Sequence, residues 1–90
     1  MISHEQREQV TVAILQSLDA VHPNGLTAHS LMTPLKLSGL TLLERADVES
    51  LLSDMQEAGH VKLAASKLAS EVKRFVRTDA GRVLLREAGL

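Results

Sequence analysis

The sequence predicts a small, mainly α-helical domain with one β-hairpin. Its 90 residues allow a single hydrophobic core, so we expect one domain over residues 1–90. The apolar residues are almost all aliphatic, with Phe75 as the only aromatic, and over most of the chain they recur at the spacing of one helix face. After His60 this spacing changes to the alternation that is typical of strands.

A capping-box pattern begins the first predicted helix, which runs from Ser3 to Ala20. Ser3 and Gln6 stand three residues apart, so each side chain can pair with a backbone N–H that the helix start leaves unpaired. The helix ends before a turn at 22–25, because Pro23 disfavours helical backbone at the residue before it.

The second predicted helix is short, Ala28 to Thr33, with Thr27 as its N-cap. Pro34 lacks an N–H donor and disfavours helix at Thr33. We therefore interpret Pro34 to Leu37 as a separate turn.

The third predicted helix, Thr41 to Ala58, contains the longest periodic stretch. Thr41 and Glu44 repeat the capping-box spacing at its start, and Gly59 stands just past its end. Its apolar face is expected to consist of Val48, Leu51, Leu52 and Met55.

Two β-prone runs and a last helix follow. The runs His60 to Ala64 and Val72 to Arg77 are interpreted as two antiparallel strands. Their connection, Ala65 to Ser70, has a composition that also suits a helix. The last predicted helix is Asp79 to Ala88, after the start signal Thr-Asp-Ala-Gly.

The core is expected where the apolar helix faces meet the hairpin. As the only aromatic side chain, Phe75 should fill the gap between hairpin and helices. The predicted core residues are Ile14, Leu18, Leu31, Val48, Leu52, Met55, Phe75 and Leu84.

Three segments in this order resemble the winged-helix (winged helix-turn-helix) superfamily of bacterial regulators. "VAILQSLDAVHPNGLTAHSLM" is similar to the first helix, a short strand at Gly-Leu-Thr and the start of the second helix. "DVESLLSDMQEAGHVKL" is similar to the third helix and first wing strand, and "RFVRTDAGRVLL" to the end of the wing and its Thr-x-x-Gly element. The resemblance implies the order α-(β)-α-α-β-β-α and a DNA-binding module in transcription regulation.

The third helix carries more acids than a DNA-reading helix tolerates. Glu44, Asp47, Glu49, Asp54 and Glu57 stand against Arg45. Phosphates would repel such a surface, so we expect this helix to stay out of the groove. It is either a solvated face or, in the alternative function, a protein-docking surface formed by Glu44, Asp47, Glu49 and Asp54.

The predicted hairpin is basic instead. Its candidate nucleic-acid-binding residues are Lys62, Lys67, Lys73, Arg74 and Arg77, which outweigh Glu71. Contacts from these side chains would be to phosphates of double-stranded DNA, hence weak and non-specific. The competing interpretation is that Lys and Arg only keep the hairpin edges soluble.

Composition excludes or disfavours other classes of function. Without Cys there is no thiolate nucleophile or thiolate metal site, and the four His show no metal-ligand spacing. No nucleophile elbow or glycine-rich phosphate loop is present, so we expect neither an enzyme nor a cofactor. The N-terminus lacks an export signal and no apolar run is long enough to span a membrane, which predicts a soluble, cytoplasmic protein.

We also expect a homodimer through the terminal helices. Leu15 lies beside the main apolar stripe of the first helix, and the chain ends at Leu90. Exposed on so small a body, these residues would form a sizeable apolar patch.

Overall fold

The predicted class, mainly helical with one hairpin, is confirmed. A computed structural model describes residues 3–41, 43–64 and 73–89. The elements are α1 (His4–Val21), α2 (Ala28–Leu37), α3 (Arg45–Glu57), β1 (Val61–Leu63), β2 (Phe75–Arg77) and α4 (Asp79–Glu87). The expected strand start at Val72 and the connection from Ala65 to Ser70 lie outside the described residues.

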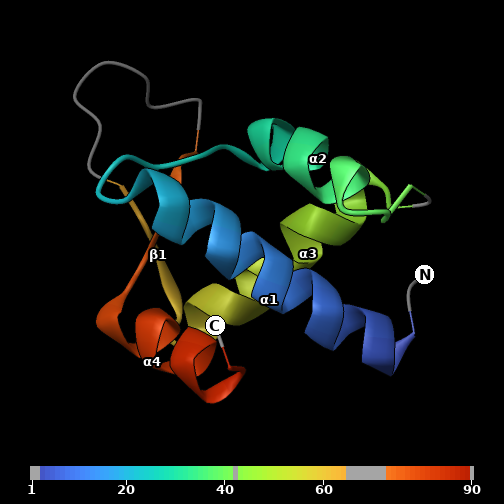
Figure 1. Ribbon diagram of the computed structural model, residues 1–90. Helices are drawn as coiled ribbons and strands as arrows, with labels where there is room; N and C mark the ends of the chain where they lie inside the picture. Colours follow the sequence, from blue (N-terminus) through green and yellow to red (C-terminus); the bar gives the residue numbers. More distant parts are fainter. Residues whose placement is uncertain (1–2, 42, 65–72, 90) are drawn as a thin grey trace.

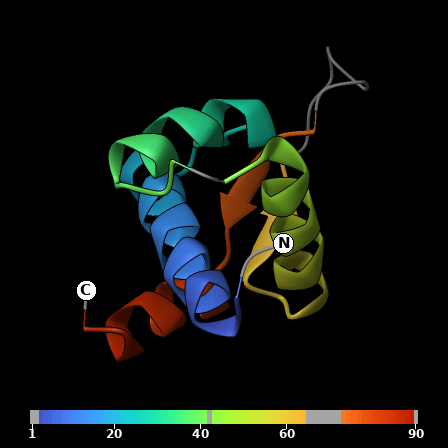
Figure 2. The same cartoon turned by 90° about the vertical axis from the view of Figure 1, so that its right-hand side faces the viewer.

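Helix α1 runs through the middle of the molecule. Figure 1 shows α2 on one side of α1 and α4 on the other, and Figure 2 shows α1 and α3 on opposite sides of the hairpin. The helix α1 contacts α2, α3, α4 and β2, while α2 packs mainly on α3. The Ser3–Gln6 capping box forms as expected at the start of α1.

The core lies between α1, α2, α3 and the hairpin, and seven of the eight predicted core residues are buried in it. Phe75 is 8% exposed, as expected for the side chain between hairpin and helices. The exception is Leu84, which is half-buried, because the face of α4 that meets the core carries Gly81 and Leu85 instead. Leu15, expected at the surface, is fully buried and is no part of an exposed patch.

Helix α2 continues through Pro34 to Leu37, so the predicted end at Thr33 is wrong. Proline removes only the hydrogen bond to the Ser30 carbonyl, and Ser30 is exposed to water, which can solvate that oxygen. Leu31 and Leu35, on either side of Pro34, are both fully buried. Their burial outweighs the local cost of proline.

Helix α3 starts four residues later than predicted, and its capping box is Glu44 with Asp47 rather than Thr41 with Glu44. The carboxylate of Asp47 accepts from the Glu44 backbone N–H at 3.0 Å. Leu43 donates its N–H to the Leu40 carbonyl in a turn and is buried, 5% exposed. Burying Leu43 in this turn moves the N-cap of the helix to Glu44.

The hairpin is antiparallel, with Val61 opposite Arg77 and Leu63 opposite Phe75. Leu26 adds a short third segment, because its N–H and carbonyl both bond to the backbone of Phe75, at 3.0 and 2.9 Å. Gly25 permits this approach, since a Cβ there would lie 3.0 Å from the Phe75 carbonyl oxygen. The short strand that the resemblance implied at Gly-Leu-Thr is therefore present as a bridge.

Thr78 joins the hairpin to α3 and α4. Its hydroxyl accepts from the Gly81 N–H at 3.1 Å as the N-cap of α4 and donates to the Gly59 carbonyl at 2.6 Å. A Cβ on Gly81 would lie 2.4 Å from the His60 carbonyl oxygen, so α4 approaches this turn as only glycine allows. Gly59, just past α3, and Gly81, of the Thr-x-x-Gly element, are thus both hydrogen-bonded to the Thr78 hydroxyl. This contact positions the hairpin against both helices.

Candidate nucleic-acid interface

The register of the hairpin brings Lys62 and Arg74 to one face. Lys62 pairs with Val76, and the Ala64 N–H donates to the Arg74 carbonyl at 2.8 Å, which extends the ladder by one residue. Side chains two residues apart in a strand share a face, so Lys62 and Arg74 are diagonal neighbours across the strands. Both are exposed.

Lys73 precedes Arg74 and is exposed as well. Successive residues alternate between faces, so Lys73 projects from the other side of the extended chain. Lys67, also expected to bind nucleic acid, lies outside the described residues. The described part of the hairpin thus presents three exposed bases, of which Lys73 and Arg74 precede β2.

Arg77 is directed elsewhere. Its Nε donates to the Asp19 carboxylate at 2.5 Å, and its side chain is 15% exposed. The sequence grouped Arg77 with the other bases because it lies in the same strand, but it faces the core side with Phe75, against α1. The structure therefore separates Arg77 from Lys62, Lys73 and Arg74.

Four of the five acids assigned to the third helix, all but Glu57, contact their own chain. Glu44 and Asp47 form the capping box, and Glu49 accepts from Arg45 Nε at 3.1 Å, one turn apart. Asp54 accepts from Arg7 of α1. Two arginines and the positive end of the helix thus offset much of the negative charge that the sequence alone assigned to this surface.

Helical geometry also distributes these acids over different sides of α3. Glu49 and Asp54 are five residues apart, which is about 140° around a helix. The line opposite the buried face consists of Ala46, Ser50, Ser53 and Glu57, all exposed. Counting charges along the sequence missed this mostly uncharged ridge, which sorting the residues by helical angle would have found.

Residues 3–41, 43–64 and 73–89 contain neither a metal cluster nor a membrane-spanning helix. No group of three or more His, Asp or Glu side chains in that part is placed to hold a metal ion. None of the described helices is long and apolar enough to cross a membrane.

No protein-family model matches the chain, and no curated protein matches it. Solved structures do. A PadR-like transcriptional regulator from Bacillus cereus superposes with a TM-score of 0.74 at 25% identity, over 94% of this chain and 82% of that one. The described elements of this chain follow the order α-(β)-α-α-β-β-α that the resemblance implied. The chain has the winged-helix fold.

Two more structures share this winged helix. A MepR variant from S. aureus bound to an oligodeoxyribonucleotide has a TM-score of 0.73 at 19% identity, over 91% of this chain and 56% of that one. The PcaV transcriptional regulator from Streptomyces coelicolor has a TM-score of 0.70 at 21% identity, over 94% and 57%. This chain therefore spans little more than half the length of these two regulators. Within its winged helix, β1 and β2 are the wing strands.

Proposed function

We propose that the chain is a DNA-binding module that acts in transcription regulation and holds the phosphate backbone through the bases of its wing. The observation that carries this proposal is the placement of the exposed Lys62 and Arg74 as diagonal neighbours on one side of the hairpin, with the exposed Lys73 next to Arg74 in the chain. Lysine and arginine that project from a wing strand suit phosphate contacts.

Two further observations support the proposal. Glu44, Asp47, Glu49 and Asp54 are held in capping and ion-pair contacts within the chain, which weakens the electrostatic objection to DNA. A similar winged helix, that of MepR, has been solved with an oligodeoxyribonucleotide. The same contacts leave the protein-docking alternative at Glu44, Asp47, Glu49 and Asp54 without a specific observation in its favour.

The test is the salt dependence of binding to a random-sequence duplex, measured by fluorescence anisotropy from low salt upward. Replacing Lys73 and Arg74 together by Ala should weaken binding and flatten the plot of log K against log salt by roughly one to two units, because two phosphate contacts are lost. Lys36→Ala, a change of an exposed base on α2, is the matched control. An equal loss of affinity in the Lys36→Ala control, or no binding of the duplex by the parent at low salt, would contradict the proposed role of the wing.

We further propose that the module works as a homodimer in the cytoplasm and has a binding role rather than a catalytic one. With Leu15 buried and Leu90 outside the described residues, the dimer proposal depends on Val83, which is 49% exposed on α4. Sedimentation of the parent and of Val83→Lys tests it. A dimer that Val83→Lys dissociates supports the proposal, and a parent that stays monomeric at high micromolar concentration contradicts it.

A further inference from the structure

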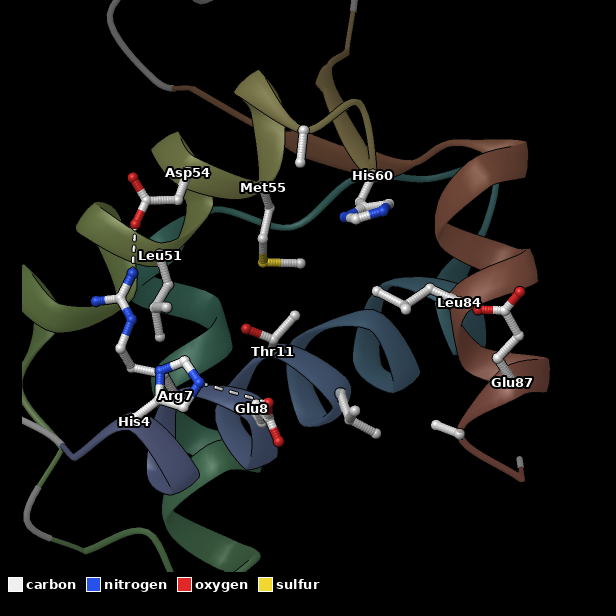
Figure 3. A pocket seen from close by; sticks show the side chains of 13 residues that line it. His4, Arg7, Glu8, Thr11, Leu51, Asp54, Met55, His60, Leu84 and Glu87 are labelled. Atoms are coloured by element: carbon white, nitrogen blue, oxygen red, sulfur yellow. Dashed lines mark hydrogen bonds and ion pairs between the residues drawn. The ribbon is translucent and has the colours of Figure 1, made fainter.

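A groove opens between the first half of α1, the end of α3 and the end of α4, on the far side of α1 from α2. Its cavity volume is about 510 Å³, within the range of small-molecule sites. We call it the α1–α4 groove, and Figure 3 shows it from close by. Val83, the proposed dimer contact, does not line it.

The floor of the α1–α4 groove is apolar. Figure 3 shows the Met55 and Leu84 side chains pointing toward the same open space, with Thr11 beside them. Val12 and Leu84 are half-buried apolar side chains that pack against the core, so they leave part of their surface to the groove. An alkyl or aryl group placed there would bury apolar surface that water now covers.

The rim of the α1–α4 groove is negative. It carries three carboxylates, those of Glu8, Asp54 and Glu87, against the single guanidinium of Arg7. Arg7 is bound to Asp54, so this pair contributes little net charge. Glu8 and Glu87 come from α1 and α4, so the excess negative charge faces the groove from two helices. His4 and His60 complete the ionisable rim, and His4 Nε2 lies 3.7 Å from Glu8.

We propose that the α1–α4 groove binds an amphipathic organic cation, an alkyl or aryl ammonium whose apolar body lies on Met55 and Leu84. Its charged head would lie between the carboxylates of Glu8 and Glu87. An amphipathic anion would contact the same apolar floor but would be repelled by Glu8 and Glu87, because the one guanidinium at the rim already has a carboxylate partner. A small polar cation would be attracted by the carboxylates, but it has no apolar group to cover the floor of the groove.

The test compares two probes with the same tail, octyltrimethylammonium and octanesulfonate, both below their micelle-forming concentrations. Titrations into the ¹⁵N-labelled chain, followed by ¹H–¹⁵N correlation spectra, give the dissociation constant and the site together. We expect saturable shifts at the amides of Thr11, Met55 and Leu84, and at least threefold tighter binding of the cation. Equal affinity for both probes, no saturable binding of the cation, or shifts centred elsewhere would overturn the proposal.

The double change Glu8→Gln and Glu87→Gln tests the role of charge without removing the apolar floor. Each exposed carboxylate is expected to contribute about a two- to fivefold change in affinity for the cation, since solvent screens such contacts. Glu87 lies in the last turn of α4, where an acid does not favour the helix, so the variant should fold. Glu57→Gln removes an exposed acid that does not line the groove and serves as the control. Loss of affinity in the control but not in the double variant would contradict the proposed site.

Discussion

Arg77 of the second wing strand donates its Nε–H to the carboxylate of Asp19 in α1, at 2.5 Å. The same carboxylate lies 3.6 Å from Arg82 Nη1 in α4. Asp19 is 30% exposed and Arg77 15% exposed, so this contact is more sheltered than the ion pairs at the rim. The Asp19 carboxylate thus contacts both β2 and α4. It gives Arg77, one of the five bases predicted from the sequence to bind DNA, a partner within the chain.

This contact predicts that Arg77 supports the wing rather than binding phosphate. Asp19→Asn and Arg77→Ala should each lower the free energy of unfolding by about 1–3 kcal/mol, as for a hydrogen bond between charged groups. Neither change should flatten the salt dependence of duplex binding. Urea denaturation and anisotropy titrations measure the two effects separately. Arg45→Ala, which removes an exposed pair with Glu49, should cost less than about 1 kcal/mol. A drop of one unit in the salt slope for Arg77→Ala alone would place its guanidinium on a phosphate.

Gly81 gives a test in which helix propensity and packing predict opposite signs. Propensity alone favours alanine in a helix by about 1 kcal/mol. A Cβ at this position would lie 2.4 Å from the His60 carbonyl oxygen, which belongs to the backbone. Gly81→Ala should therefore destabilise the chain by about 1–3 kcal/mol, as overpacking does. Ala80→Gly, one residue earlier and exposed, should cost only about 0.5–1 kcal/mol. A raised melting temperature for Gly81→Ala would show that α4 can move away from the turn.

Phe75 contributes the largest apolar side chain that bridges the wing and the helices. It is 8% exposed, and its backbone also bonds to Leu26. Phe75→Ala should cost about 3–5 kcal/mol, which is a large part of the stability of a chain this size. Leu37→Ala is the control, because Leu37 is 84% exposed and should change stability by less than about 0.5 kcal/mol. Thermal melting checks both, and equal melting temperatures would mean that Phe75 packs against nothing essential.

The sequence predicted the fold well because its signals were local. The Ser3 cap, the apolar face of α3 and the alternation after His60 each act within a few residues. The errors arose where burial decided instead. Burial of Leu35 carries α2 past Pro34, and burial of Leu43 delays the start of α3.

The candidate site was less predictable, since a charged residue's partner can be far away in the sequence. Arg77 and Asp19 are 58 residues apart, and Arg7 and Asp54 are 47 apart. No spacing rule connects residues at such distances. The α1–α4 groove was missed for the same reason, because it forms only where three helices meet.

The sequence alone gives no reason to distinguish Glu49→Lys from Asp54→Lys, but the ion pairs of α3 do. Glu49→Lys places a base beside Arg45 on the exposed side of the helix, and it should strengthen duplex binding severalfold at low salt because repulsion from phosphates falls.

Asp54→Lys changes the charge by the same amount but breaks an ion pair between α1 and α3, since Arg7 then loses its carboxylate partner, whereas Glu49→Lys breaks one within α3. It should lower the free energy of unfolding by about 0.5–1 kcal/mol and strengthen DNA binding less, because residue 54 lies on the side of α3 that faces α1. Anisotropy titrations at matched salt, with urea melts of both variants, compare them. If both variants gain equally in affinity, net charge alone governs binding. If neither binds DNA at low salt while both lose a protein partner, the acidic residues of α3 are a docking surface and the DNA-binding proposal fails.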